Sequence, residues 1–299
     1  MSNPTPPKPA VMTSIATLWN PLDQTLLLQF NTDQDGCLVA QSRQSEGDTN
    51  NTNITVNGNK VIIGQQVTNG SQIVAFPNSE LLSVFGVATQ VDNGVTTNYV
   101  ALLSPYFNAF SNAVIQGNSL AFAYQDMNTA WLYYLTGNPL TLTELALQSG
   151  GTTVNPLNNP GLFSPQTSLA AFYDPVQGAR CVITQDCSGN VALTAVNDDE
   201  QSTNALGQLS NAKQNSPFAA VYNNGQFYIY YVAQNKDLLW RATGASNNVT
   251  GIHNLDQTVD QYTQISVTAD PQNKKNHVFF VANGGSGRTI VHYVDQLPA

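Results

Sequence analysis

Residues 217–244 read PFAAVYNNGQFYIYYVAQNKDLLWRATG and place an arginine and a tryptophan close to several tyrosines. Arg241 and Tyr230 could donate hydrogen bonds to a ligand oxygen, and Trp240 and Tyr228 could form an aromatic pocket wall. Consecutive residues of a strand point to opposite faces, so Trp240 and Arg241 cannot share one pocket. We predict catalytic roles for Arg241 and Tyr230 and substrate contacts for Trp240 and Tyr228. The alternative is that Trp240 packs between sheets and Arg241 faces solvent.

A second aromatic group surrounds the sequence WLYY at 131–134. Trp131 and Tyr133 share one face of the expected strand because they are two residues apart. Tyr124 lies in the preceding strand, and Tyr106 and Phe107 come before it. We predict that these five residues contact a substrate, with packing between sheets as the alternative.

Three further aromatic residues, Trp19, Tyr173 and Tyr222, end the matching segments IATLWN, LAAFYD and FAAVYN. Matching positions in several copies of one unit point to a scaffold role. We therefore expect these three residues to be structural.

The motifs of conventional catalysis, GxSxG, HExxH, the P-loop and CxxC, are absent from the sequence. His253, His277 and His292 fall in different strands or loops, and we expect each to be structural or exposed. The acidic run Asp198, Asp199 and Glu200 is predicted to be a solvated loop. The glycine-rich segment 284–288 is predicted to be a turn rather than an anion site. We expect neither a metal nor a cofactor.

The three cysteines, Cys37, Cys181 and Cys187, are an odd number and predict no disulfide framework. Cys181 and Cys187 are expected on one extended segment that runs into a turn, where they lie too far apart to bond. We expect free, mostly buried thiols.

The chain of 299 residues has 10 lysines and arginines against 19 aspartates and glutamates, a net charge of −9. This charge repels phosphate backbones and anionic membrane surfaces, so nucleic acid is not an expected partner. No apolar run is long enough to predict a membrane span.

Four sequons, at Asn50, Asn53, Asn69 and Asn248, predict N-glycosylation and favour a secretory route. The first residues, MSNPTPPKPA, do not have the pattern of a signal peptide. We expect either a protein that is not secreted or one whose signal has been removed. Residues 1–10 are predicted to form a tail.

Apolar residues recur in short alternating runs bounded by Gly, Asn, Asp and Pro, which predicts an all-β protein. One unit occurs six times: a small-residue strand that ends in an aromatic, a turn, a β-prone strand, a second turn and an alternating strand. The units start at Ser14, Ser71, Ser111, Ser168, Ser216 and Thr263. Their spacing of about 50 residues is that of four-stranded propeller blades, with fourth strands expected within 59–67 and 141–149. We predict a six-bladed β-propeller over 11–299, with a β-sandwich as the alternative.

The segments IATLWN, LAAFYD and FAAVYN, followed by LLLQF, CVITQ and IYYVAQ, resemble the fungal fucose-specific lectins, which are six-bladed propellers. The resemblance covers 14–296. In that family each sugar site resembles an Arg-x-Tyr strand, a Glu early in the next strand and a stacking aromatic from a neighbouring blade. Only Arg180 lies near such a place, and the third strands CLVAQ, VALTA, LLWRA and IVHYV contain no Glu. Because sugar hydroxyls need charged partners to offset desolvation, we expect no arginine–glutamate pair and no fucose binding.

Among lectin-like propellers that lack the sugar residues, the acidic, aromatic-rich chain resembles the fungal hetero-Diels–Alderases of tropolonic sesquiterpenoid pathways. The resemblance implies a cofactor-independent enzyme that joins a tropolone ortho-quinone methide to a humulene-type sesquiterpene. Such a cycloaddition transfers no proton; it needs an apolar cavity that orients two reactants, and donors on the diene oxygens. This is the functional hypothesis. The alternatives are a carbohydrate-binding lectin with altered specificity and a non-catalytic interaction protein.

Overall fold

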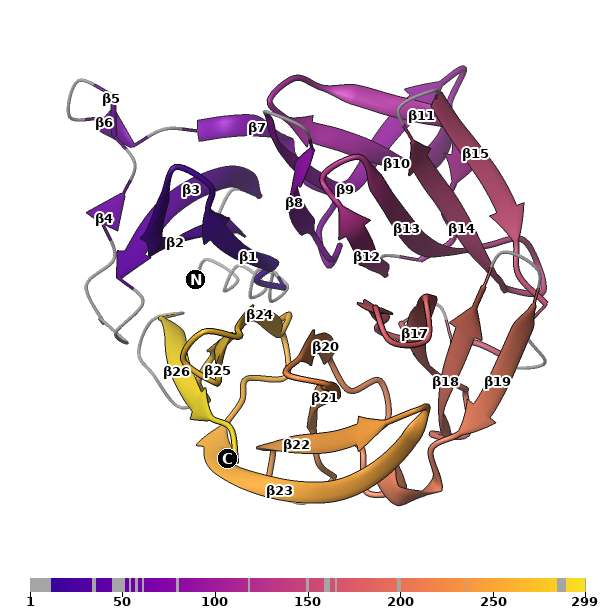
Figure 1. Ribbon diagram of the computed structural model, residues 1–299. Coiled ribbons are helices and arrows are strands. Elements are labelled where there is room, and N and C mark those ends of the chain that lie inside the picture. Colours follow the sequence, from indigo (N-terminus) through magenta and orange to yellow (C-terminus); the bar gives the residue numbers. More distant parts are fainter. Residues whose placement is uncertain are drawn as a thin grey trace, which may run out of the picture.

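Six antiparallel sheets surround one axis in the computed structural model, as blades of a β-propeller (Figure 1). The structure describes residues 12–33, 36–44, 52–53, 55–56, 59–60, 62–78, 81–117, 119–148, 151–158, 162–164, 166–197, 200–234, 236–283 and 289–298. The prediction of a six-bladed propeller is confirmed. The alternative of a β-sandwich is wrong, because the sheets form a ring rather than two packed layers.

Each blade is numbered in chain order and begins with its innermost strand. Blade 1 contains β1 (Ile15–Asn20), β2 (Asp23–Thr32), β3 (Cys37–Gln44), β4 (Thr52–Asn53) and β7 (Ile62–Gln66). Blade 2 contains β8 (Val74–Asn78), β9 (Leu81–Asp92), β10 (Val95–Ser104) and β11 (Asn108–Val114). Blade 3 contains β12 (Leu120–Asp126), β13 (Thr129–Thr136), β14 (Thr141–Gln148) and β15 (Gly151–Pro156).

Blade 4 contains β16 (Ala170–Asp174), β17 (Ala179–Gln185), β18 (Val191–Val196) and β19 (Gln201–Ala205). Blade 5 contains β20 (Phe218–Asn223), β21 (Gln226–Val232), β22 (Leu238–Ala245) and β23 (Asn248–Thr258). Blade 6 contains β24 (Ser266–Asp270), β25 (Lys275–Val281) and β26 (Ile290–Gln296). A short hairpin, β5 (Thr55–Val56) with β6 (Asn59–Lys60), and a 3-10 turn, η1 (Gly207–Leu209), complete the elements. Within the described ranges, no helix has the length and apolarity needed to cross a bilayer.

The third unit starts later than the sequence predicts. Residues 111–114, expected to open it, belong to β11, the outer strand of blade 2, and blade 3 begins at Leu120. Residues 141–148, expected as a fourth strand, are the third strand, β14. The reason is that LAFAY at 120–124 is the small-residue strand ending in an aromatic, and each later strand of the unit shifts with it. The other expected fourth strand is confirmed, since β7 pairs with β3.

Asn-Gly turns close two of the blade hairpins. Asn93 and Gly94 have φ angles of 49° and 80°, and Asn224 and Gly225 have 48° and 82°. Positive φ at both positions is the geometry of a two-residue hairpin loop whose twist matches the strands, and Asn-Gly is the favoured pair there. The turns therefore set the register of β9 with β10 and of β20 with β21.

A hydroxyl residue before the inner strand fixes the start of several blades. The side chains of Ser71, Ser216 and Thr263 each donate to the carbonyl of the next residue. Each also accepts a hydrogen bond from a backbone N–H of the second strand, at Val87, Val232 and Val281. The repeated Ser or Thr thus joins the first two strands of a blade and satisfies an otherwise buried donor.

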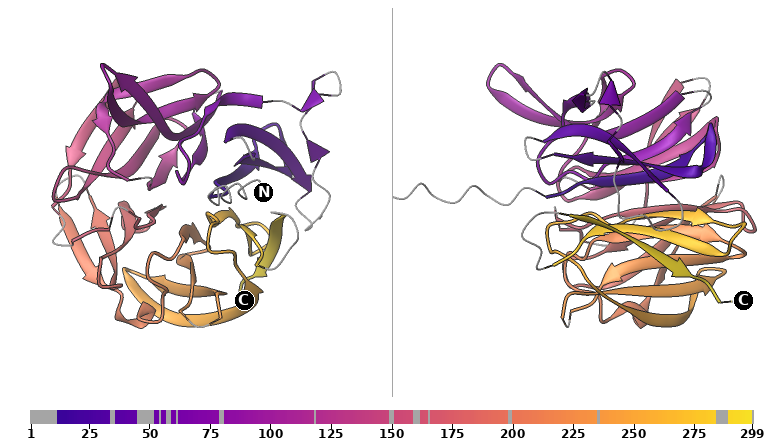
Figure 2. Two further views of the ribbon diagram at one scale, coloured as in Figure 1. Left: turned by 180° about the vertical axis from the view of Figure 1, so that it is seen from behind. Right: turned by 90° about the vertical axis from the view of Figure 1, so that its left-hand side faces the viewer.

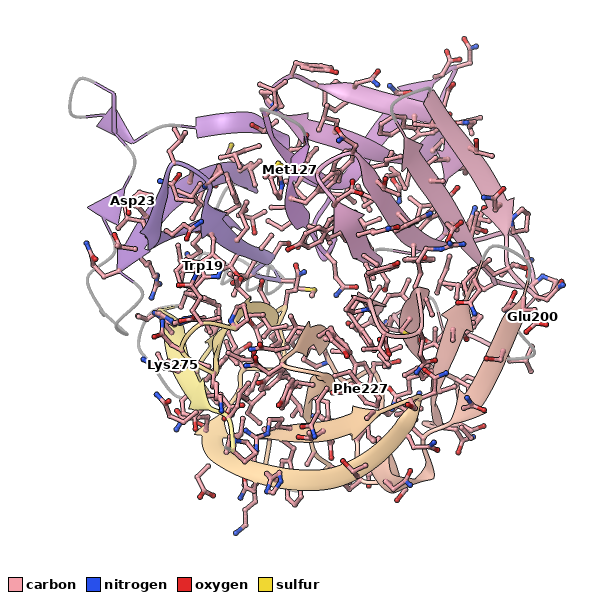
Figure 3. All side chains as sticks on the ribbon, viewed as in Figure 1. Trp19, Asp23, Met127, Glu200, Phe227 and Lys275 are labelled. Carbon is pink, nitrogen blue, oxygen red and sulfur yellow. The ribbon has the colours of Figure 1, made fainter. Side chains whose placement is uncertain are left out.

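The apolar core consists of six clusters, one between each pair of neighbouring blades, and side chains from both sheets fill these interfaces (Figure 3). Alternation along β22 sends Trp240 toward blade 4 and its neighbour Arg241 toward blade 6. The prediction that these two residues lie on opposite faces is confirmed. Burial of whole aromatic side chains stabilises each interface by about 1.5–3 kcal/mol per side chain.

Blades 6 and 1 are neighbours and close the ring (Figure 2), and side-chain contacts join them. The Thr17 hydroxyl lies 2.9 Å from that of Ser266 and 2.8 Å from that of Thr268. The Trp19 indole N–H donates to the Ala269 carbonyl at 2.7 Å. These contacts tie the two ends of the chain together within the described residues.

Candidate functional site

A channel of about 630 Å³ runs along the axis of the propeller. The inner strands of all six blades line it, from β1, β8, β12, β16, β20 and β24. Most of the lining residues are alanine, valine, leucine, isoleucine or aromatic. The volume and the apolar walls fall within the range of small-molecule pockets, about 300–1,000 Å³.

Two glutamines join the blades at one end, called here the channel floor. The Gln72 side chain of blade 2 accepts from the N–H groups of Leu120 and Leu169 and donates to the Ser168 hydroxyl. The Gln264 side chain of blade 6 accepts from the N–H groups of Ile15 and Ile73. Both glutamines are nearly buried. Because each amide bonds to two other blades, the floor holds the inner strands in fixed positions.

The other end, called here the channel mouth, carries one residue from each blade, near the end of its inner strand. These six residues are Trp19, Pro77, Tyr124, Tyr173, Tyr222 and Ala269. The channel is therefore polar at the floor and mainly aromatic at the mouth, and between them its side chains are mostly apolar, with hydroxyls at Thr17, Ser266 and Thr268. Trp19, Tyr173 and Tyr222, predicted to be structural, do pack against the clusters between neighbouring blades, and they also line the cavity.

The hydroxyls of Tyr124 and Tyr222 at the mouth are kept in the protonated, donating form. Burial raises the pKa of Tyr124, although half of this residue is exposed, because protein surrounds it inside the channel. Burial, and then the negative charge of Asp174, raise the pKa of Tyr222. A neutral phenol can donate a hydrogen bond to a ligand oxygen.

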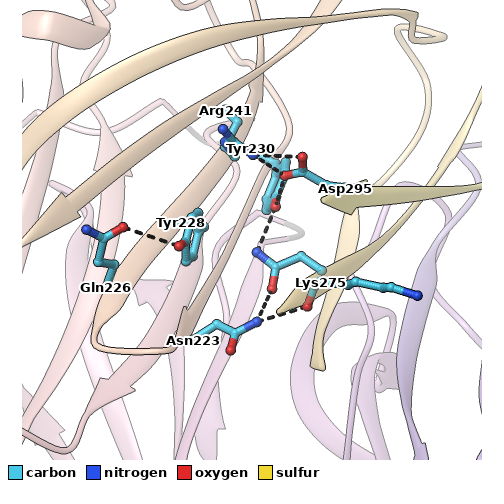
Figure 4. Close-up of polar contacts among 8 residues, drawn as sticks. Asn223, Gln226, Tyr228, Tyr230, Arg241, Lys275 and Asp295 are labelled. Carbon is cyan, nitrogen blue, oxygen red and sulfur yellow. Dashed lines mark hydrogen bonds and ion pairs between the residues drawn. The ribbon is translucent and has the colours of Figure 1, made fainter. Parts of the chain in front are cut away.

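Arg241 and Tyr230, predicted to be catalytic, lie between blades 5 and 6 and away from the channel lining (Figure 4). The Arg241 guanidinium donates through Nη1 to both carboxylate oxygens of Asp295, at 2.7 and 2.9 Å. The Tyr230 hydroxyl donates to Asp295 Oδ2 at 2.7 Å and accepts from Asn276 at 2.8 Å. Burial, then the Asp295 charge, hold the pKa of Tyr230 well above its usual value. These polar groups bind one another away from the channel, so the geometry favours a structural role for Arg241 and Tyr230 over the predicted catalytic one.

Trp131 and Tyr133 lie between blades 3 and 4 beside an ion pair that the sequence analysis did not expect. Arg180 Nε donates to Glu144 Oε2 at 3.1 Å, and the Tyr133 hydroxyl donates to the same oxygen at 2.8 Å. The Arg180 guanidinium lies 4.7 Å from the centre of the Trp131 ring. The expectation that no arginine–glutamate pair exists is wrong, because Glu144 belongs to the third strand β14. The side chains of Arg180 and Glu144 are 9% and 3% exposed, so the pair is enclosed by the blades.

The other residues predicted to contact a substrate are mostly packed between blades or exposed outside the channel. Trp240 packs against the cluster between blades 4 and 5. Tyr228 is buried between blades 5 and 6, with its hydroxyl donating to Gln226. Tyr106 and Phe107 are exposed between β10 and β11 and do not line the channel. Of the predicted contacts, only Tyr124 lies in the channel wall.

All arginines that the described residues include lie in blade interfaces over aromatic rings. Arg43 lies 5.5 Å from the Phe279 ring centre and donates to the Ile290 carbonyl, between blades 1 and 6. Arg180 and Arg241 have the same arrangement at two other interfaces, over Trp131 and Tyr228. The pattern indicates that buried guanidinium groups hold neighbouring blades together.

His277 and His292 meet in the interface of blades 6 and 1, a contact that their separate strands did not reveal. His277 Nδ1 lies 2.9 Å from His292 Nε2, and the His292 ring stacks on Phe279. Burial, then the charges of His277 and Arg43, lower the pKa of His292 to about 3. His292 is therefore neutral in the folded protein near neutral pH.

Acid is expected to destabilise the protein through His292. An unfolded histidine has a pKa of about 6.5, so the unfolded chain takes up a proton before the folded one does. Stability is expected to fall as the pH decreases from about 6.5 toward about 3. Thermal unfolding followed from pH 7 to pH 4 measures this, with His292→Leu as the comparison. The wild type should lose melting temperature more steeply than the variant; equal slopes would contradict the account.

The predictions for the remaining residues have mixed outcomes. Cys37, Cys181 and Cys187 are free thiols, as predicted, but Cys187 is exposed. Burial, and then the charge of Asp174, raise the pKa of the Cys181 thiol to about 12.

Asn69 and Asn248 are exposed, in a turn and at a strand start, so a glycan would fit there. Asn50, most of the run 198–200 and the segment 284–288 lie outside the described residues, as does the side chain of Asn53.

No protein-family model and no curated protein sequence matches the chain. Solved structures do match over nearly its whole length. The Aleuria aurantia lectin, as an N224Q mutant in complex with alpha-methyl-L-fucoside, is 16% identical with a TM-score of 0.67, over 97% of this chain and 99% of the lectin. AofleA from Arthrobotrys oligospora is 12% identical with a TM-score of 0.69, over 96% of this chain and 83% of AofleA. BP39L lectin from Burkholderia pseudomallei is 18% identical with a TM-score of 0.61, over 91% of this chain and 77% of the lectin. The chain therefore has the six-bladed β-propeller fold seen in the fungal fucose-binding lectins.

Proposed function

We propose that the axial channel binds two hydrophobic reactants and that the protein is a cofactor-independent hetero-Diels–Alderase. The reactants would be a tropolone ortho-quinone methide and a humulene-type sesquiterpene. The observation that supports this function best is the channel itself: about 630 Å³, lined mostly by apolar side chains and with tyrosine hydroxyls at its mouth.

The reaction transfers no proton, so it needs no acid–base catalyst. The exocyclic carbon and the oxygen of the quinone methide each form a bond to one carbon of the alkene, and no atom leaves. The protein has to hold the two molecules in a near-attack arrangement and place a donor on the diene oxygen, which makes the diene more electrophilic. Neutral Tyr124 and Tyr222 at the mouth are suitable donors.

The floor supports this role because it limits movement of the wall. Gln72 and Gln264 join inner strands across the ring, so the channel is preformed rather than assembled around a ligand. A rigid wall lowers the cost of orienting reactants, since less ordering has to occur on binding.

A carbohydrate-binding lectin with altered specificity is the second candidate, supported by the likeness to lectins whose structures contain fucosides. The one arginine–glutamate pair within the described residues, Arg180 with Glu144, does not favour it. Both carboxylate oxygens of Glu144 already accept hydrogen bonds, from Arg180, Tyr133 and Asn155. A sugar would have to displace these partners.

The stereochemistry of the product tests the proposal. A precursor that releases the quinone methide is incubated with humulene, with and without the protein, and the adduct is analysed by chiral chromatography. We expect the protein to give one enantiomer in excess and above the background rate. Racemic product at the background rate would overturn the enzyme proposal. Clear binding on a glycan array in that case would favour the lectin.

A further inference from the structure

The six residues of the channel mouth divide into two halves of different chemistry. Blades 3, 4 and 5 are consecutive in the ring and contribute Tyr124, Tyr173 and Tyr222. Blades 6, 1 and 2 are also consecutive and contribute Ala269, Trp19 and Pro77. One half thus carries phenol groups and the other carries carbon surfaces.

The three phenols at the mouth differ from most tyrosines between the blades. The hydroxyls of Tyr133, Tyr230 and Tyr231 each donate to a protein side chain, on Glu144, Asp295 and Asn211. Within the described part of the chain, the hydroxyls of Tyr124, Tyr173 and Tyr222 have no such partner. They are therefore available to a molecule inside the channel.

Polar groups of the opposite half are already engaged. The Trp19 indole N–H donates to the Ala269 carbonyl at 2.7 Å, which leaves the ring of Trp19 as an apolar surface. Deeper in the channel, the hydroxyls of Thr17, Ser266 and Thr268 bind one another at 2.8 and 2.9 Å. Two of these three hydroxyl protons are used in the mutual contacts, so this half offers one free hydroxyl donor, against three on the tyrosine half.

We propose that the mouth orients a ligand with two different sides, so that its oxygen atoms contact the tyrosines of blades 3–5 and its hydrocarbon part contacts Trp19 and Pro77. The ligand class is a small neutral molecule with hydroxyl or carbonyl oxygens on one side. This rests on the proposed function and deepens it: the tropolone side is assigned to one half of the ring and the terpene to the other. A fixed orientation of both reactants is what selects one face of the alkene.

Equilibrium dialysis with tropolone alone and with humulene alone tests the division, because it requires no turnover. The triple variant Tyr124→Phe, Tyr173→Phe, Tyr222→Phe keeps the rings and removes the hydroxyls. Loss of one neutral hydrogen bond weakens binding by about tenfold, so tropolone affinity should fall by at least this factor. Humulene affinity should change by less than about twofold. Tyr262→Phe, at an exposed tyrosine outside the channel lining, is the matched control.

The reverse pattern is expected on the apolar half. Trp19→Leu removes aromatic surface and should weaken humulene binding roughly tenfold while tropolone binding is kept. Pro77→Ser serves as the second variant if Trp19→Leu does not fold. Equal loss of both ligands in either set of variants, or unchanged tropolone affinity in the triple variant, would overturn the division.

The two proposals fail in distinguishable ways. Enantiomerically enriched product from a triple variant with unchanged tropolone affinity would remove only the orientation proposal. Wild-type protein that binds neither tropolone nor humulene, and yields racemic product, would remove both.

Discussion

Replacing Arg241 with alanine is expected to lower the free energy of unfolding by about 3–5 kcal/mol, since a buried carboxylate then loses its cationic partner. Asp295 accepts two hydrogen bonds from Arg241 and one from Tyr230, and both members of the ion pair are less than a tenth exposed. Without Arg241, the Asp295 charge would have to be held by Tyr230 alone. Chemical denaturation monitored by fluorescence measures the loss.

A double variant separates the buried charge from the packing. Arg241→Met with Asp295→Leu removes both charges and fills similar volume, and such replacements are often neutral or stabilising. We expect it to recover most of the stability that Arg241→Ala loses. Product formation per folded molecule should be unchanged in Arg241→Ala. A fall in turnover well beyond the loss of folded protein would restore Arg241 as a catalytic residue.

Filling the channel with Ala220→Trp is expected to lower turnover at least about 100-fold, because two reactants no longer fit in a near-attack arrangement. Ala220 lies on the inner strand β20, lines the channel and also packs against the cluster between blades 4 and 5, so the indole occupies the channel edge of that interface. Some loss of melting temperature is expected from overpacking, so turnover is compared per folded molecule. Chiral analysis of the adduct and a thermal unfolding curve are measured on the same sample.

Two further variants make the channel-filling result specific. Ala205→Trp places the same indole on the exposed outer strand β19 and should leave turnover unchanged. Ala75→Trp fills the channel from blade 2 and should reproduce the loss. Normal turnover in both channel-filled variants would show that the reaction takes place elsewhere on the protein.

The sequence was sufficient for the fold because its signals are local. Alternation within strands, Asn-Gly at 93–94 and 224–225, and a repeated strand ending in Trp19, Tyr173 or Tyr222 all lie within short segments. The third unit was displaced because segment 111–117 also starts with a serine and small residues. Because of this error, the segment TLTEL at 141–145 was assigned to a fourth strand instead of a third one. Glu144 was therefore not recognised as a third-strand glutamate that could pair with an arginine.

Contacts between blades could not be read from the sequence. Arg180 meets Glu144 across 36 residues, and Arg241 meets Asp295 across 54, with no pattern that links them. Arg241 looked like a ligand donor because its partner is in another blade. The mouth, by contrast, had a usable signal: the position near the end of the inner strand that Trp19, Tyr173 and Tyr222 occupy lines the axis in every blade. In the other three blades this position is held by Pro77, Tyr124 and Ala269.

Diffraction from crystals soaked with the coupled tropolone–humulene adduct tests the central claim most directly. The account predicts adduct density inside the axial channel, with its oxygen atoms within hydrogen-bond distance of Tyr124, Tyr173 or Tyr222. Adduct density between two blades at the outer rim, with an empty channel, would contradict it.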